Sequence, residues 1–338
     1  MAITAKPKKL TSGVRIGVFV YDGCSAWIVS GILELFEIAN VAARHMGRRE
    51  PTTFMARAVS SFGMPAIATT QIRLQSIRPR EPLDVLIVPP IWHQSAAYLE
   101  EALKRLSPTL KRLPALCERS HLVTSACSGA VLLAETGMLE RKTATTCWWL
   151  SDWFKLRYPN VRLSPERLMA IDGRTWTAAA GSAYIHLGLR IVESFAGKEL
   201  STMTAKLLLV EPNRGTQAPY LSPGFTNADR QGPLAVLNTF VLNHIENPVR
   251  ISELASAAHM SVRSLFRYFE KTKGISPLEF VQRMRIDRAK QLLEQTQDSV
   301  DSITAKCGYE DVSSFRKLFR NRVGMTPKEY RQRFGTIA

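Results

Sequence analysis

Two stretches near the end of the chain decide its fold: Ser252–Arg283, SELASAAHMSVRSLFRYFEKTKGISPLEFVQR, and Ser302–Arg333, SITAKCGYEDVSSFRKLFRNRVGMTPKEYRQR. Aligned at an offset of fifty residues without a gap, they share helix-ending as well as apolar residues. A fixed period of this kind is the signature of a repeated structural unit. The matches are Ser252/Ser302, Ala255/Ala305, Val262/Val312, Ser264/Ser314, Phe269/Phe319, Gly274/Gly324, Pro277/Pro327, Glu279/Glu329, Gln282/Gln332 and Arg283/Arg333.

Each repeat predicts a helix with one apolar face and a capping residue at its start. Ser261 and Asp311 are suitable N-caps, and Gly274 and Gly324 stand where a C-terminal glycine ends a helix. The apolar spacing follows the i, i+3, i+4, i+7 pattern of a half-buried helix. The residues expected to face inward are Val262, Leu265, Phe266 and Phe269 in the first helix and Val312, Phe315 and Phe319 in the second.

Further helices are predicted on either side of this pair. Short helices over 251–258 and 300–307 precede the two, with Ala258 and Gly308 in the tight turns. Capping boxes with proline at the first helical position are predicted by Ser276-Pro277-Leu278-Glu279 and Thr326-Pro327-Lys328-Glu329. The helix from Pro277 to about Leu293 would be about 25 Å long. It would hold two recognition helices near the ~34 Å spacing of successive major-groove faces.

This paired helix-turn-helix pattern predicts binding to DNA. The outward faces of the two helices are polar and basic, as a major-groove reader requires. The alternative is an ordinary solvated helix face. We expect Arg263, Ser264, Arg267, Ser313, Ser314 and Lys317 to point toward base edges and Arg316 and Arg320 to lie nearer phosphate, with Tyr268 on the same outward face.

Composition is consistent with a polyanionic partner but does not locate its site. The formal net charge of the 338 residues is +16. Both parts of the chain carry the excess: from Pro233 onward there are 17 Lys and Arg against 11 Asp and Glu. The five cysteines form no CxxC pair, which favours a reducing compartment. No signal-like N-terminus or run of about 20 apolar residues is present, so we expect a cytoplasmic protein without membrane attachment.

The first two-thirds of the chain alternates between strands and helices. Strands are expected over 14–21, 53–60, 84–88 and 121–126, and helices over 27–40, 95–106, 108–119, 128–136, 183–197 and 199–210. Such alternation predicts an α/β doubly wound, mostly parallel sheet covered on both faces. We expect a flexible tail over 1–13, this α/β domain over 14–211, a linker over 212–232 and an all-α domain with two helix-turn-helix units over 233–338.

Ser125-Ala126-Cys127-Ser128-Gly129 stands where a strand turns into a helix, which would expose Cys127 near a helix N-terminus. With DVLIVPP upstream and LERKTATT downstream, this run resembles the PfpI-like branch of the glutamine-amidotransferase-like superfamily. The second half, with Gly308-Tyr309, Thr326-Pro327 and Tyr330-Arg331, resembles the AraC/XylS family of transcriptional regulators. Together they resemble the GlxA type of regulator. The resemblance implies promoter DNA and RNA polymerase as partners, usually activation, and a homodimer.

Three departures from the catalytic PfpI-like pattern argue against an enzyme. The position of the acidic residue on the first helix holds Ile28, and Cys147 stands where a histidine is implied. The oxyanion turn reads Pro89-Pro90, and proline has no N–H to donate. Losing such a donor removes about 3 kcal/mol of transition-state stabilisation. We therefore expect no catalytic residues, although a Cys127-dependent enzyme fused to a DNA-binding domain is an alternative.

The domain is expected to act as a sensor, with its pocket at the carboxyl ends of the strands. Aromatic walls suit an amine or a quaternary ammonium group through cation–π contact. The resemblance implies small nitrogenous metabolites such as amino acids and betaines. The alternatives are a thiol redox switch between Cys127 and Cys147, or a domain that only dimerises. No histidine or cysteine spacing predicts a metal, and no cofactor is expected. The expected pocket residues are Trp92, His93, Cys127, Ser128, Cys147 and Trp148.

Overall fold

The computed structural model describes residues 13–47, 51–222 and 232–335, which belong to two compact units, Met1–Gln217 and Ala218–Ala338. Apart from Gly13, the expected N-terminal tail lies outside the described residues, and so do residues 223–231 of the expected linker. The two units are therefore described one at a time.

The first unit is built on a six-stranded sheet of order β2-β1-β5-β6-β10-β9. All neighbouring strands pair in parallel except β9, which is antiparallel to β10. This architecture confirms the α/β fold class. The strands are β1 (Val14–Phe19), β2 (Phe54–Val59), β5 (Leu83–Val88), β6 (Ser120–Ala126), β9 (Met169–Asp172) and β10 (Thr175–Ala178), with the shorter pairs β3 (Ala66–Ile67) with β4 (Arg73–Leu74) and β7 (Thr143–Ala144) with β8 (Arg162–Leu163).

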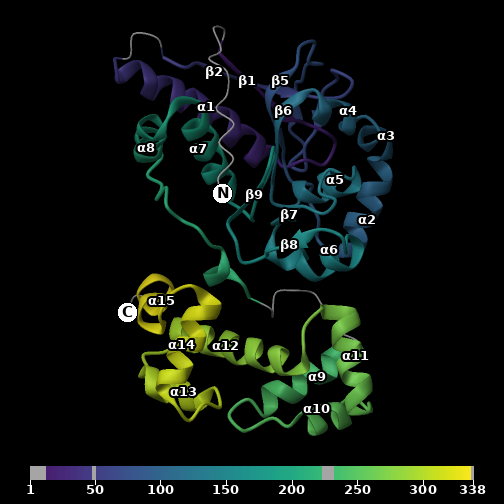
Figure 1. Cartoon of the computed structure of the whole chain (residues 1–338), viewed down its shortest axis with the longest axis vertical. Helices are drawn as coiled ribbons and strands as arrows, with labels where there is room; N and C mark the ends of the chain where they lie inside the picture. The colour runs from purple at the N-terminus through teal and green to yellow at the C-terminus, as the bar shows by residue number, and fades with distance from the viewer. Residues whose placement is uncertain (1–12, 48–50, 223–231, 336–338) are drawn as a thin grey trace. The chain divides into compact units, whose positions relative to one another are not determined.

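Helices cover both faces of this sheet, as the parallel pairing requires (Figure 1). One layer packs together from α1 (Ala26–His45), α7 (Ala183–Ala196) and α8 (Lys198–Leu207). On the other face lie α2 (Ala96–Arg105), α3 (Ser107–Leu110), α4 (Leu113–Glu118) and α5 (Gly129–Glu135). The single helix expected over 108–119 is thus two short ones. After β7 come the 3-10 turn η1 (Trp148–Leu150) and α6 (Ser151–Arg157).

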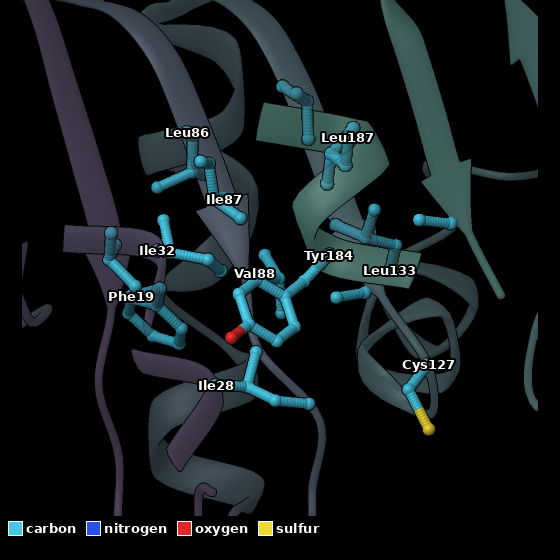
Figure 2. Packing of buried hydrophobic residues seen from close by; sticks show 14 of the residues in the cluster. Phe19, Ile28, Ile32, Leu86, Ile87, Val88, Cys127, Leu133, Tyr184 and Leu187 are labelled. Atoms are coloured by element: carbon cyan, nitrogen blue, oxygen red, sulfur yellow. The ribbon is translucent and has the colours of Figure 1, made fainter. Parts of the chain in front are cut away.

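The core of the first unit includes buried residues of strands β1 and β5 and of helices α1, α5 and α7 (Figure 2). Helix α1 is the one helix of the described residues whose length and apolarity would suit a membrane. More than half of its apolar window is buried, and it packs against β2, α7 and α8, as a core helix does. Gly31 lets this helix approach α7, because a Cβ there would stand 2.3 Å from the Tyr184 hydroxyl.

The second unit contains two small helical bundles that share one helix (Figure 1). The shared helix α12 gives Phe280 and Val281 to the first core and Ile286 and Leu293 to the second. The first bundle is α9 (Pro233–Asn243), α10 (Ile251–Ala257), α11 (Val262–Lys273) and the start of α12 (Pro277–Gln295). The second is the end of α12 with α13 (Val300–Lys306), α14 (Val312–Val323) and α15 (Pro327–Phe334).

The helix boundaries predicted from capping residues are confirmed, but the width of one apolar face was wrong. Leu265 and Phe269 are fully buried on α11, whereas Val262 is 43% exposed and Phe266 is 46% exposed. The bundle is small, so only one narrow strip of α11 contacts the other helices. In α14 the expected Phe315 and Phe319 are fully buried, and Val312 is half-buried.

The segment between the units is anchored on both sides of the division. Gln217 is 2% exposed within the first unit, and its side-chain amide donates to the carbonyls of Thr146 and Pro165 at 2.9 and 2.6 Å. Ala218 belongs to the second unit, where buried Lys290 donates to the carbonyls of Ala218 and Leu221. Part of the expected linker is therefore ordered structure.

Candidate functional site

The two recognition helices α11 and α14 begin and end as their sequences predict. The Ser261 hydroxyl accepts from the Ser264 N–H at 3.1 Å, and the Asp311 carboxylate accepts from the Ser314 N–H at 2.6 Å. Gly274 and Gly324 close the helices in the left-handed conformation, at φ 63° and 82°. Both helices therefore have fixed ends and present a defined outer face.

The outer faces are basic and largely free of internal ion pairs. Arg263 and Arg267 on α11, and Lys317 and Arg320 on α14, are exposed and form no ion pair among the described residues. Arg316 is also exposed but pairs with Asp301 at 3.3 Å. Ser313 and Ser314 lie on the exposed face of α14, while Ser264 on α11 is half-buried. The exposed cations therefore face solvent on the sides of α11 and α14 that point away from the bundle cores.

Tyr268 is placed differently from the prediction. Its side chain is half-buried and packs against the first core, with its ring 5.9 Å from that of Phe269 at an interplanar angle of 82°. The helix therefore presents Tyr268 at the edge of the bundle rather than on its outer face.

An ion-pair bridge connects the two helix-turn-helix units. Oε1 of Glu279, at the start of α12, accepts from Arg283 and from Arg322 of α14, both at 2.9 Å. Burial raises the pKa of Glu279, but the hydrogen bonds from Arg322 and Arg283 outweigh it and hold that pKa below its ordinary value. Glu279 was predicted to complete a capping box with Ser276. Its N–H does bond the Ser276 hydroxyl, but its carboxylate serves the bridge instead.

The strand-to-helix turn of the first unit has the strained geometry of a nucleophile elbow. Cys127 takes φ 53°, a left-handed conformation that side chains other than glycine rarely adopt. Gly129 is required here, since a Cβ at that position would lie 2.3 Å from the Val88 carbonyl oxygen. The end of β5 and the start of α5 are thus in direct contact beneath Cys127.

Cys127 and Cys147 are brought together, as the resemblance implied. A hydrogen bond with the Cys147 thiol is the main cause that lowers the pKa of Cys127, and the backbone around Ser128 and Gly181 adds to it. Burial raises the pKa of Cys147. Cys127 is 6% exposed and Cys147 is fully buried. The pair lies within the fold rather than in an open cleft.

No histidine side chain activates this thiol in the described structure. His93 is held in one tautomer, because its Nε2 accepts from the Trp149 indole N–H at 3.0 Å and its Nδ1 lies 3.1 Å from the Ile91 carbonyl. Burial lowers the pKa of His93, and both of its ring nitrogens are engaged by these neighbours. Trp148 packs edge-on against Trp149 with the ring centres 5.4 Å apart.

The other two departures from the catalytic pattern, Ile28 and the Pro89-Pro90 turn, lie close to the Cys127 turn. Ile28 is buried in the core beside the Tyr184 ring, at the same end of the sheet as Cys127 (Figure 2). The carbonyl of Pro89 accepts from the Tyr21 hydroxyl, and the Ser128 hydroxyl donates to the Ile91 carbonyl at 2.7 Å. The turn after β5 thus supplies acceptors toward the elbow.

A cavity of about 510 Å³ lies beside the elbow, at the carboxyl ends of β1 and β5. Of the six expected pocket residues, Trp92 lines it; His93, Cys127, Ser128, Cys147 and Trp148 do not. Its walls come from the turn after β1, the β3–β4 hairpin, the loop after β5 and helices α2 and α3. The lining residues are Asp22, Gly23, Ile67, Ala68, Thr69, Gln71, Ile91, Trp92, Tyr98, Ala102, Arg105, Leu106, Pro108 and Thr109.

The cavity contains two charges that the sequence did not single out. Asp22 and Arg105 both line it, and within the described residues neither forms an ion pair. Arg105 lies over the Tyr98 ring at 5.8 Å, and Asp22 accepts from the Ile67 N–H at 2.8 Å. Nothing in the sequence distinguishes Asp22 or Arg105 from other surface charges, because the segments meet only in the folded chain.

Comparisons with known proteins agree with the helix-turn-helix description of the second unit. Residues 254–333 match the family model described as "Helix-turn-helix domain". The HTH-type transcriptional regulator CdhR of Pseudomonas aeruginosa is 29% identical over 280 residues, covering 81% of this chain and 80% of that protein. The regulator GbdR of the same species is 28% identical over 221 residues, covering 65% and 60%. A THiJ/PfpI family protein from Pseudomonas syringae has 18% identity, a TM-score of 0.48, and coverage of 65% and 88%.

These features define a DNA-binding transcriptional regulator, with two helix-turn-helix units after an α/β domain. Within that class, the chain is similar to the HTH-type transcriptional regulators CdhR and GbdR, and its similarity to the helix-turn-helix model lies in residues 254–333.

Proposed function

We propose that this regulator is ligand-responsive and that its first domain binds a small zwitterion in the cavity beside the elbow. The observation that carries the proposal is that one cavity is lined by both a carboxylate, Asp22, and a guanidinium, Arg105. Neither group forms an ion pair among the described residues. The aromatic rings of Trp92 and Tyr98 complete it. A cavity of about 510 Å³ falls within the range typical of small-molecule sites.

The ligand class follows from these groups. Arg105 would bind a carboxylate, which matches guanidinium geometry, while Asp22 would attract a cation. The exposed face of Trp92 suits an ammonium or quaternary ammonium group by cation–π attraction. An amino acid or a betaine carries both charges. A second cavity, of about 500 Å³, is lined by Glu135 and Arg157, whose charges pair with each other at 2.8 Å, and also by Glu100, Lys104 and Lys111. No aromatic ring lines it, so it lacks the wall that would hold an ammonium group by cation–π attraction.

The DNA-binding domain would place α11 and α14 in successive major grooves. In this proposal Arg263, Arg267, Ser313 and Lys317 approach base edges, with Arg316 and Arg320 nearer phosphate. Ser264 and Ser314 sit at the first turns of the two helices, where base contacts of helix-turn-helix proteins concentrate. Ligand binding would shift the protein between two arrangements of its DNA-binding domains in a homodimer, which requires different ligand affinity in each. Activation through RNA polymerase and residence in the cytoplasm belong to the same proposal.

Ligand binding can be tested by tryptophan fluorescence and thermal shift on the full chain. Glycine betaine and a panel of amino acids would be compared with choline and acetate, which each carry one of the two charges. We expect a zwitterion to quench Trp92 and, at about 100 times its Kd, to stabilise the first domain by about 2.7 kcal/mol. Asp22→Asn and Arg105→Gln should each abolish this response. Arg112→Gln is the control, because Arg112 is exposed near the cavity but does not line it.

Silence across the panel, with intact DNA binding, would contradict ligand sensing and favour a domain that only dimerises. Turnover of an amide or α-oxoaldehyde that Cys127→Ala abolishes would revive the enzyme alternative. Neither outcome depends on which residues contact DNA.

A thiol switch is a second candidate, favoured by the hydrogen bond between Cys147 and Cys127. Hydrogen peroxide would oxidise the two thiols to a disulfide, with two protons and two electrons reducing the peroxide to two waters. The test is peroxide treatment followed by thiol counting and DNA binding. A peroxide effect that persists in Cys147→Ser would exclude this pair as the switch.

A further inference from the structure

Two apolar side chains of recognition helix α11 are exposed beside the strip that packs into the core. Val262 is 43% exposed and Phe266 is 46% exposed, and they stand one turn apart on the same face. The core contacts of this helix are made by Leu265 and Phe269 instead. Phe266 has no aromatic ring partner in the described part of the chain. Exposed apolar groups that cluster in this way mark an interaction site.

The residues around them indicate what this site meets. Arg263 follows Val262, and Arg267 follows Phe266, so the apolar pair is flanked by two exposed cations that form no ion pair in the described part of the chain. DNA satisfies both features at once: phosphates take the cations, and the thymine C5-methyl group is the apolar feature of the major groove. A basic and apolar face on a recognition helix is thus complementary to thymine-containing DNA.

The second helix-turn-helix unit lacks this apolar pair, so the two helix-turn-helix units differ in the chemistry of their recognition helices. At the offset of fifty residues, Phe266 corresponds to Arg316, which is exposed and pairs with Asp301 at 3.3 Å. Val262 corresponds to Val312, which is half-buried. The outer face of α14 therefore offers hydroxyl and cationic hydrogen-bond donors, such as Ser313 and Lys317, without an exposed aromatic ring.

We propose that the first helix-turn-helix unit recognises thymine through its C5-methyl group, with Val262 and Phe266 as specificity-determining residues. The second helix-turn-helix unit recognises base edges by hydrogen bonds. The two halves of one binding site thus differ in chemistry: the half facing α11 contains thymines at the positions under Val262 and Phe266.

Replacing thymine by uracil tests this directly, because the swap removes only the methyl group. Binding sites for the full chain would be selected from randomised duplex DNA, and each thymine then replaced singly by uracil. Affinity would be measured by fluorescence anisotropy at one fixed salt concentration. We expect one or two replacements in a single half-site to weaken binding about fourfold each, the factor for one buried methyl group. In Phe266→Ala, a site with thymine under position 266 and the same site with uracil there should bind equally, while the preference for thymine under Val262 should remain.

Leu278→Ala is the matched control. Leu278 is 56% exposed and apolar, and it lies at the start of α12 rather than on a recognition helix. Its loss should leave the thymine preference unchanged. Because Phe266 is exposed, Phe266→Ala should keep its helical circular dichroism, and Phe266→Leu should retain part of the preference.

Several results would overturn the inference. One is equal binding of every uracil-substituted site by the unaltered protein. Another is an unchanged thymine preference in Phe266→Ala. If Phe266→Ala keeps both affinity and preference but fails to support transcription with purified RNA polymerase, the apolar pair contacts polymerase and not DNA.

Discussion

Replacing Gln217 by leucine should strongly destabilise the first domain. The side chain is 2% exposed, and its amide donates to the carbonyls of Thr146 and Pro165 at 2.9 and 2.6 Å. Leucine has a similar size but cannot donate, so the buried carbonyl of Thr146 and the half-buried carbonyl of Pro165 would each lose a partner. An unsatisfied buried group costs about 1–3 kcal/mol, and the half-buried carbonyl adds less because water can reach it. The longer contact from the Ala180 N–H, at 3.4 Å, adds little.

The sequence provides a domain-specific assay for this change. All six tryptophans precede Ala218, so tryptophan fluorescence in a urea titration reports the unfolding of the first domain alone. Glu166→Gln is the control, because Glu166 is exposed in the neighbouring loop and its side chain has no hydrogen bond in the described structure. A loss below about 1 kcal/mol in Gln217→Leu, or one equal to that in the control, would refute the reasoning.

Three further predictions concern the two domains separately. Phe269→Ala and Phe319→Ala each remove a fully buried ring from one of the two cores of the second unit. Each should lower the free energy of unfolding by about 3–5 kcal/mol, measured by urea titration with circular dichroism, and should abolish DNA binding. Unchanged stability in either variant would contradict the two-core description. Gly129→Ala should destabilise the first domain by about 1–3 kcal/mol, since its Cβ would lie 2.3 Å from a β5 carbonyl oxygen, whereas Gly215→Ala, in open space, should not. Burial lowers the pKa of His93, so protonation is less favourable in the folded than in the unfolded state, and stability should fall as pH drops below about 6.5. In His93→Gln the melting temperature should depend less on pH in this range, and an equal dependence in both proteins would refute this.

Features that depend on neighbours in sequence were predictable. The caps Ser261 and Asp311 and the terminal glycines Gly274 and Gly324 lie where expected, because caps satisfy backbone groups within one turn of the helix end. The strands β1, β5 and β6 were also found, because long apolar runs without helical periodicity indicate buried parallel strands. The elbow at Cys127 followed from a strand ending directly before a small-residue turn.

Features that depend on distant segments were not predictable. The spacing of Val262 and Phe266 fits an inward face, but the bundle around α11 covers only a narrow strip of that helix. The charges of the cavity come from the turn after β1 and from α2, some eighty residues apart, and neither has a local signature. Glu279 fits a capping box by sequence, yet its carboxylate accepts a hydrogen bond from Arg322 of the second helix-turn-helix unit instead. In each case tertiary contacts decide between local alternatives of similar energy.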